Sequence, residues 1–338
     1  GETLPIDLTN EQRRATCQTC RGYADSMTGA YGLNVIDLPD LIDEDIINRV
    51  EALLAAAPED LSSFEIDGFG LGQVCGAEAA VTFKTTDFTG ATPQVRRLLL
   101  WYMEGALLSY FAMKKLLSTG RIARVVHFNE YAILLASAIA ARKAGVPATF
   151  MSMASLRGVD RRRLVFISDP LAIISYRNRL KDWDSWRDLR LPAKSVREVS
   201  DDTMFRSLGN SVMVYSPVRS GSPEVVFEGL RLDTSRKLLV AFTSSIDEVS
   251  ANNLYLSAMK QAPFSEQQPF SDQIEWIEAL IARVEASDDR QLVVRIHPRE
   301  GANRRESTIS THLSLLRAHF DRSYKHVRIV WPGDEVSS

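Results

Sequence analysis

The stretch QLVVRIHPREGANRRE (291–306) gathers residue types that bind anions. An apolar, β-branched run ends at His297 and Pro298. Four arginines fall within a span of eleven residues here: Arg295, Arg299, Arg304 and Arg305. Guanidinium groups match phosphate and carboxylate oxygens in two-point contacts, and a histidine can donate to a phosphate or ribose oxygen. Proline fixes the backbone where the chain leaves the strand. The pattern indicates a local anion site at a strand end.

A second loop has the same relation to a strand. The run KLLVAFT (237–243) is followed by SSIDEVSANN, in which Ser244 and Ser245 offer hydroxyl and backbone N–H groups suited to phosphate oxygens. In a parallel open sheet, ligands bind beyond the carboxyl ends of the strands, where both loops would lie. Taken singly, a His-Pro turn, paired serines and solvated arginines are ordinary surface features. Their joint placement favours a nucleotide-phosphate site.

Composition limits the function classes. The chain has 338 residues, of which 45% are hydrophobic and 25% charged, which suits a protein of about two domains. The formal net charge is −3, so there is no global electrostatic case for nucleic-acid binding and an anion site must be local. The apolar run at 98–113 is interrupted by Glu104 and is shorter than the roughly 20 residues that span a bilayer. It is typical of a buried helix.

The cysteines do not predict a metal site. Cys17 and Cys20 have zinc-knuckle spacing, but no second pair or nearby histidine completes four ligands, and Cys75 stands alone. Three cysteines are too few for a disulfide scaffold and indicate a reducing compartment. The DWD triplet at 182–184 has the spacing of a metal-binding motif, yet its surroundings favour a solvated turn.

Alternating strands and helices predict an α/β fold. In the first half, strand 123–128, helix 129–145 and strand 146–151 form a βαβ unit with parallel strands. In the second half, strands at 237–243, 291–296 and 326–331 alternate with helices, as in half of a doubly wound domain. The expected second-half helices are 271–286, capped by Ser271 or Asp272, and 307–320, with an apolar stripe of Ile309, Leu313, Leu316 and Phe320.

We place an interdomain connection within 181–211, which divides the chain into a first domain of 1–205 and a second of 206–338. The chain stops directly after the third strand of the second domain, which would leave an uncovered sheet edge. We therefore expect further elements after Ser338. The first domain lacks an opening strand followed by a glycine-rich turn, so we also expect elements before Gly1.

The segments LLVAFTSSIDEV, QIEWIEALI, LVVRIHPREGANRRES and VRIVWPGDEVSS together resemble the nucleotide-binding half of bacterial surface-polysaccharide glycosyltransferases of the GT-B type. That group makes capsule and lipopolysaccharide chains and includes Kdo transferases with a His-Pro motif. The segment VVHFNEYAILLASAIAARKAGVPATFM resembles a βαβ unit of their acceptor-side domain. The resemblance covers residues 240–338 and 120–160.

The resemblance implies two Rossmann-like domains with parallel sheets, which face a cleft, with the donor on the second domain and the acceptor on the first. The donor-binding residues it implies are Ser244, Ser245, Arg295, His297, Pro298 and Arg299. The donor would be a CMP-, UDP- or GDP-linked sugar and the acceptor an oligosaccharide or lipid-linked glycan. Such enzymes are typically metal-independent, so no cofactor is expected. They generally work at the inner face of the cytoplasmic membrane, which implies a cytoplasmic protein open to peripheral contacts with the membrane or an assembly complex.

Such a reaction needs a group that handles the acceptor proton or stabilises the reacting sugar. Glu130 follows a strand end on the cleft side and is our first candidate; Asp247 and Glu248, beside the serine loop, are the next. Asn129 and Asp67, the latter in the glycine-rich EIDGFGLG, are candidate acceptor-binding residues. His127 lies within an apolar strand, where a core histidine is the better interpretation.

Two rival functions stay open. The first is another enzyme on the same scaffold, a sugar-nucleotide epimerase or a polyol-phosphate transferase. The second is a non-catalytic partner in polysaccharide assembly.

Overall fold

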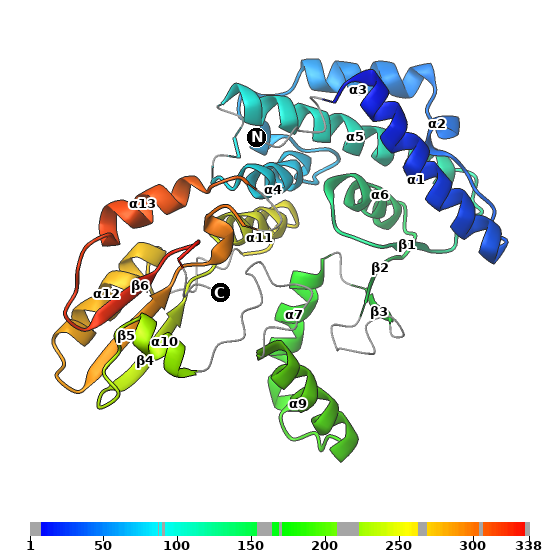
Figure 1. Cartoon of the computed structure of the whole chain (residues 1–338). Coiled ribbons are helices and arrows are strands. Elements are labelled where there is room, and N and C mark those ends of the chain that lie inside the picture. The colour runs from blue at the N-terminus through cyan, green and yellow to red at the C-terminus, as the bar shows by residue number, and fades with distance from the viewer. Residues whose placement is uncertain are drawn as a thin grey trace.

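The structure of the chain, a computed structural model, describes residues 8–86, 88–89, 92–153, 164–168, 171–207, 223–262, 269–303 and 307–334. Within these ranges it is a mixed α/β fold with two three-stranded sheets, one in each half of the chain, and many helices around them (Figure 1). The predicted α/β class is confirmed. Arg304 and Arg305 lie outside the described residues.

The amino-terminal part begins with helix α1 (Asn10–Tyr31), which has no buried residue. The Thr9 hydroxyl accepts from the Gln12 backbone N–H and the Gln12 side chain accepts from the Thr9 N–H, a capping box that fixes the start of the helix. Cys17 and Cys20 are exposed, free thiols on this helix. Two further helices follow, α2 (Leu38–Leu41) and α3 (Glu44–Ala55), and the latter packs on α5 (Pro93–Leu117).

The largest core lies among α4 (Leu71–Phe83), α5 and α6 (Ala132–Lys143). The apolar run at 98–113 falls inside α5, so the predicted buried helix is confirmed. Close approach at the start of α4 depends on Gly72: a Cβ there would lie 1.9 Å from the carbonyl oxygen of Leu61, in the short 3-10 helix η2 (Leu61–Ser63). This glycine is therefore required for close packing.

The first sheet has the order β1-β2-β3. Strands β1 (Val125–His127) and β2 (Ala148–Met153) are parallel and joined through α6, which confirms the predicted βαβ unit. Strand β3 (Leu164–Ile167) runs antiparallel to β2, so the expectation of an all-parallel first sheet is wrong for this strand.

The expected interdomain connection is largely helical. Helix α7 (Ala172–Lys181) ends where this connection starts, and helices α8 (Trp183–Trp186) and α9 (Ala193–Ser207) lie within its described part. The DWD triplet is exposed at the start of α8, as a solvated turn should be. Among the described residues, no group of three His, Cys, Asp or Glu side chains could hold a metal ion.

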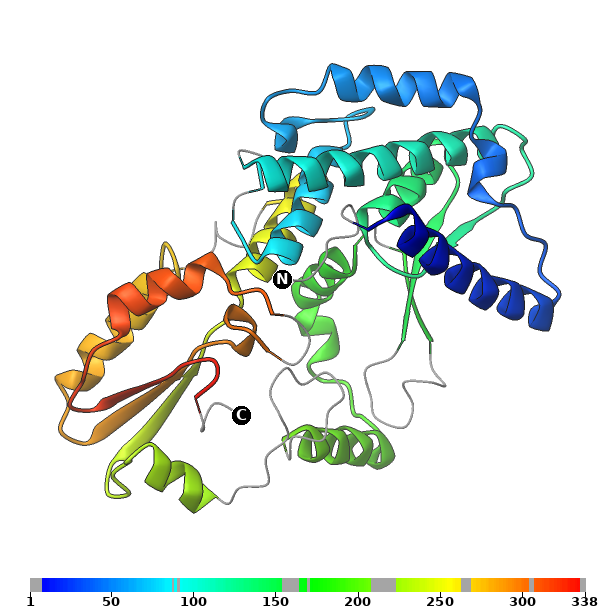
Figure 2. The ribbon, with the colours of Figure 1, turned by 45° about the horizontal axis from the view of Figure 1, so that its top comes forward.

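The second half starts with α10 (Pro223–Gly229) and continues into a parallel sheet of order β4-β5-β6, as predicted. Its strands are β4 (Lys237–Phe242), β5 (Arg290–Arg295) and β6 (Val327–Val330). Helices α12 (Gln273–Glu285) and α13 (Thr311–Phe320) share one apolar core with it (Figures 1 and 2). Asp272 is the N-cap of α12, because its carboxylate accepts from Glu275 N–H at 2.8 Å.

The predicted start of the last helix at 307 is wrong. Ser310 is the N-cap, since its hydroxyl oxygen accepts from His312 N–H at 3.0 Å and its own N–H donates to the Glu300 carbonyl at 2.8 Å. That cap begins α13 at Thr311 and leaves Ile309 before the helix and 59% exposed.

Helix α11 (Ile246–Ala258) follows β4 but packs on α4 of the first half. Its Ala251 and Leu254 contact Ala77, while Leu256 and Ala258 belong to the largest core. Figures 1 and 2 both show α11 beside α4, between the two sheets. The second half is therefore anchored in the first through a helix of its own. None of the described helices combines the length and apolarity needed to cross a membrane.

Candidate functional site

The parallel pairing of β4 with β5 brings the two predicted loops together. Phe242 pairs with Arg295 in the last pair of the parallel ladder, so the segments after β4 and after β5 leave the sheet at the same edge. Just beyond it, Thr243 N–H donates to the Arg295 carbonyl at 3.1 Å, and His297 N–H donates to the Thr243 hydroxyl at 2.7 Å. We call Thr243–Glu248 and Arg295–Glu300 the β4–β5 edge.

His297 is half-buried at the centre of this edge. Its Nδ1 accepts from Arg299 N–H at 3.2 Å and so caps the 3-10 helix η4 (Pro298–Glu300). Burial lowers the pKa of His297, and the charges of Arg295 and Arg299 lower it further. A neutral ring that accepts at Nδ1 carries its proton at Nε2. His297 can therefore present an N–H donor without a charge.

The two serines have different surroundings. Ser244 is exposed, and its carbonyl accepts from Gln273 Nε2 at 3.0 Å. Ser245 is buried and its hydroxyl donates to Asp247 Oδ1. The Ile246 N–H, the first of α11, donates to Glu300 Oε1 at 3.0 Å. A carboxylate of the protein thus occupies part of the helix N-terminus that we had assigned to a phosphate, and Ser244 is the more accessible serine.

A buried ion pair lies under the edge. Arg299 donates from Nε and Nη2 to Asp247 Oδ2 at 3.1 and 2.9 Å, and from Nη2 to the Val81 carbonyl at 2.8 Å. The side chains of Asp247 and Arg299 are 0% and 8% exposed. This placement favours a structural role for both, since a nucleophile or a donor-binding arginine must reach the ligand.

Glu248 is the accessible carboxylate of the edge. Its side chain is 43% exposed, and Oε1 lies 3.6 Å from Arg299 Nε. Arg295 is half-buried at the end of β5, and burial lowers its pKa. Pro298 occupies the first position of η4, where its fixed φ suits the turn.

Sequence reasoning missed Lys84, which locks the edge to the first half. It is fully buried after α4, and its Nζ donates to the carbonyls of Gly301 at 3.0 Å and Thr308 at 2.5 Å. An isolated lysine after an alanine-rich helix gives no signal of this role in the sequence, because both acceptors are more than 200 residues away.

Glu130 lies away from the β4–β5 edge, after β1. Its Oε1 accepts from Ala172 N–H at the start of α7, and burial raises its pKa. Asn129 is half-buried and its Oδ1 accepts from Tyr131 N–H at 3.1 Å, which shapes the turn into α6. His127 is 6% exposed, as expected for a core histidine, and burial lowers its pKa. Its Nδ1 contacts the Asn129 carbonyl at 2.9 Å.

A second carboxylate near Glu130 was not predicted. Glu78 Oε1, on α4, accepts from the Tyr255 hydroxyl of α11 at 2.7 Å and from Ala132 N–H at 3.2 Å. Burial raises the pKa of Glu78, and burial together with the charges of Glu78 and Glu130 raises that of Tyr255. The sequence places Glu78 in an apolar helix, where an acidic residue is costly unless it has partners. That mismatch is the signal that could have identified it.

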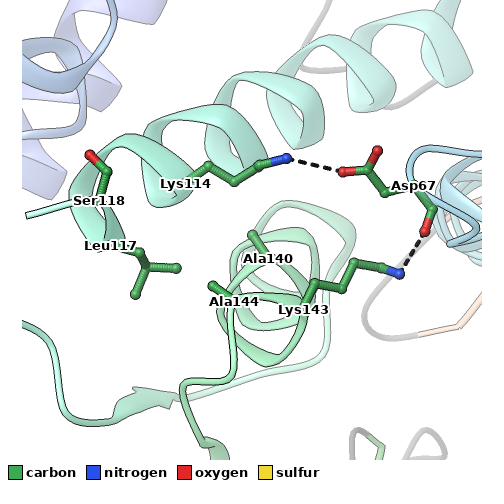
Figure 3. Close-up of a pocket in the computed structure, with 7 residues that line it drawn as sticks. All are labelled: Asp67, Lys114, Leu117, Ser118, Ala140, Lys143 and Ala144. Carbon is green, nitrogen blue, oxygen red and sulfur yellow. Dashed lines mark hydrogen bonds and ion pairs between the residues drawn. The ribbon is translucent and has the colours of Figure 1, made fainter. Parts of the chain in front are cut away.

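Asp67 lies in a two-residue turn with Gly68, both with positive φ, between Ile66 and Phe69. Its Oδ2 accepts from the Tyr110 hydroxyl at 2.6 Å and from Lys114 Nζ at 3.1 Å, and these contacts lower its pKa. Its carbonyl accepts from Lys143 Nζ at 2.6 Å. Asp67, Lys114 and Lys143 line an open pocket of about 490 Å³ between α5 and α6 (Figure 3). Asp67 is therefore accessible in that pocket, and no residue of the β4–β5 edge is among those that line it.

The chain has no match among protein-family models, curated proteins or solved structures.

Proposed function

We propose that the chain is a glycosyltransferase that uses a nucleotide-sugar donor, with the donor phosphates at the β4–β5 edge and a GT-B type arrangement of the two halves. The observation that carries this proposal is the hydrogen bond from His297 N–H to the Thr243 hydroxyl at 2.7 Å. It holds the Ser244 loop and the His297 loop side by side at the carboxyl edge of a parallel sheet, where such folds bind nucleotides.

The structure supports a division of roles within the edge. Ser244, His297 and Arg295 are the groups that we assign to the donor, because each has surface exposed at the edge. Asp247 and Arg299, which are buried against each other, are assigned to the scaffold below. Neutral His297 would donate from Nε2 to a phosphate oxygen, and the arginine charge would stabilise the departing nucleotide.

The carboxylates divide by location. Tyr255, which contacts Glu78, is ten residues along α11 from Ser245, or about 15 Å at 1.5 Å per residue. Glu248, in the first turn of α11, is closer to the donor groups and is our candidate for the base that takes the proton from the acceptor hydroxyl. We assign Glu130 and Glu78 to the acceptor side, where their raised pKa values suit hydrogen bonding to sugar hydroxyls.

The first test is thermal stabilisation by CMP, CDP, UDP and GDP. A ligand at 100 times its Kd adds about 2.7 kcal/mol. With an unfolding entropy of about 2.1 cal/mol/K per residue, 338 residues would show a Tm increase of about 4 °C. His297→Asn removes Nε2 but keeps an acceptor for Arg299 N–H, so it should abolish the shift without loosening the loop. His319→Ala, an exposed histidine on α13, is the matched control.

Turnover gives the second test. The donor for this test is the sugar linked to the nucleotide that stabilises the protein. Glu248→Gln should slow the release of nucleotide from that donor by about 10²–10⁴-fold, and it should leave the thermal shift intact. If no nucleotide stabilises the folded chain, the donor site is wrong and a non-catalytic assembly role becomes the better account. If a nucleotide binds but the sugar is rearranged and not transferred, the epimerase alternative replaces the transferase.

A further inference from the structure

A small basic pocket lies at the opposite end of the second sheet from the β4–β5 edge, where β4, β5 and β6 begin. Its volume is about 220 Å³. The charged and titratable side chains that line it are Arg231, Asp233, Arg236, Lys325, His326 and Arg328. We call it the strand-start pocket. In Figure 1 the strands run away from it towards α11.

The pocket holds more positive than negative charge. Arg236 is paired with Asp233, at 3.3 Å between Nε and Oδ2. The Arg328 guanidinium donates to main-chain carbonyls, among them that of Leu230 at 3.1 Å, and has no carboxylate partner among the described residues. Within that same part of the chain, the side chains of Arg231 and Lys325 make no hydrogen bond or ion pair. Arg231, Lys325 and Arg328 therefore line the pocket without a carboxylate partner of their own, while Asp233 is paired with Arg236, and the repulsion among the cations would be relieved by a bound anion.

The backbone at Arg231 adds an independent observation. Its φ is +51°, in the left-handed region. Arg231 N–H donates to the Glu228 carbonyl and Leu232 N–H to the Phe227 carbonyl, the two bonds that close α10 in a Schellman motif. Glycine is usual at this position, and another residue costs about 1–2 kcal/mol there. Arg231 stands where glycine would avoid the strain, and a strained residue of this kind is a reason to look for function. Its side chain contributes a guanidinium group to the pocket.

The walls of the pocket are fixed by polar contacts, most of them part-buried. Gln291 accepts from Asp233 N–H at 2.9 Å and donates to the Asp233 carbonyl at 2.6 Å, which ties the loop before β4 to β5. Glu285 accepts from the N–H groups of Lys325 and His326 at 3.2 and 2.6 Å, which fixes the loop before β6. A site with its backbone already positioned loses little entropy when it binds a ligand.

We propose that the strand-start pocket binds a phosphate group, carried either by a soluble phosphate ester or by a lipid headgroup. Guanidinium and ammonium groups that converge on one point are the usual phosphate ligands. The volume is below the roughly 300–1,000 Å³ of sites for drug-sized ligands, so it suits one small anionic group and not a whole nucleotide sugar. The site is separate from the β4–β5 edge and does not depend on the function proposed there.

The test compares two double variants of the whole chain. Arg231→Gln/Lys325→Gln removes the two cations that have no partner, and Arg190→Gln/Lys194→Gln removes the same two charges from exposed positions before and within α9. The probes are inorganic phosphate, measured by calorimetry at low ionic strength, and phosphatidylcholine vesicles with and without phosphatidylglycerol, measured by flotation. We expect the pocket variant to bind at least tenfold more weakly and the control variant to change by less than twofold.

Pocket-dependent binding of phosphate alone identifies a soluble ester as the ligand, and pocket-dependent binding of the anionic vesicles alone identifies a lipid headgroup. Arg231→Gly is a second variant, because it relieves the left-handed strain. It should be at least as stable as the natural chain and still bind the same probe more weakly. If the natural chain binds neither probe, or if both double variants weaken binding equally, the proposal is overturned.

Discussion

Replacing Asp247 by alanine tests whether this residue supports the β4–β5 edge or reacts with a ligand. The substitution leaves the Arg299 guanidinium, 8% exposed, without the carboxylate that it contacts at 2.9 and 3.1 Å. Breaking a buried pair by removing one partner costs about 3–5 kcal/mol. Glu248, with Oε1 at 3.6 Å from Arg299 Nε, remains as a partly exposed counter-charge. We therefore expect the lower part of that range, about 3 kcal/mol.

The assay is urea unfolding of Asp247→Ala, Arg299→Met and the double variant, followed by circular dichroism. Because the double variant leaves no unpaired buried charge, its loss of stability should be smaller than the sum of the single losses, with a coupling of about 1–3 kcal/mol. The reasoning is refuted if Asp247→Ala costs under about 1 kcal/mol and yet abolishes nucleotide binding or turnover. Asp247 would then act on the ligand, as the sequence suggested.

Three other changes have definite expected outcomes. Glu78→Gln keeps the acceptor oxygen but cannot ionise. Since burial raises the pKa of Glu78, the natural chain should lose stability as pH rises through that raised pKa, and the variant should lose less. Unfolding free energies measured between pH 4 and 8 would show the difference. Lys84→Met removes the donor to two carbonyls and should cost about 3–5 kcal/mol in urea unfolding; a cost near zero would mean that this contact does not hold the two halves together. Gly72→Ala should lower stability by about 3 kcal/mol or more, followed by Tm, because the added Cβ would lie 1.9 Å from a carbonyl oxygen. Gly29→Ala in α1 should raise stability by about 0.5–1 kcal/mol, because no atom lies within 4 Å of the Cβ added there. Equal effects of the two substitutions would contradict this account.

Local pattern was enough to predict the second sheet. Strands β4, β5 and β6 are short apolar runs rich in β-branched residues, and the structure places each within one or two residues of its predicted bounds. Ser271 and Asp272 were the two predicted caps, because a short polar side chain before an amphipathic run satisfies the first N–H groups of a helix, and the structure shows Asp272 in that role. These features depend on neighbours in the sequence, and their physics is therefore visible there.

Contacts between distant segments were not predictable in the same way. The expected anion site counted Arg299 as a ligand-binding group, but its partners are Asp247, 52 residues away, and the Val81 carbonyl, 218 residues away. Nothing in the local pattern distinguishes an arginine that faces a ligand from one that closes a buried pair. The same limit applies to Glu300, which accepts from the first N–H of α11 from a loop 54 residues away.

The first sheet shows a different limit. Strand β3 is a run of four residues, LVFI, that pairs antiparallel to β2, and we did not predict it as a strand. Both parallel and antiparallel pairing satisfy the backbone hydrogen bonds of such a short strand. A run of four residues is too short for periodicity to predict either the strand or its direction.

The anchoring of the β4–β5 edge bears on how the two halves could work together. Lys84 and the Val81 carbonyl hold the loop after β5 against the end of α4, and α11, which carries Glu248 in its first turn, packs along α4 itself. The donor groups that we propose are thus built on elements fixed to the first half as well as to their own sheet. Any closure around a nucleotide sugar would have to move Ser244 and His297 together with α4. It follows that Glu78, also on α4, keeps its position relative to the donor groups, so the acceptor side and the donor side of the proposed site are set by one helix pair.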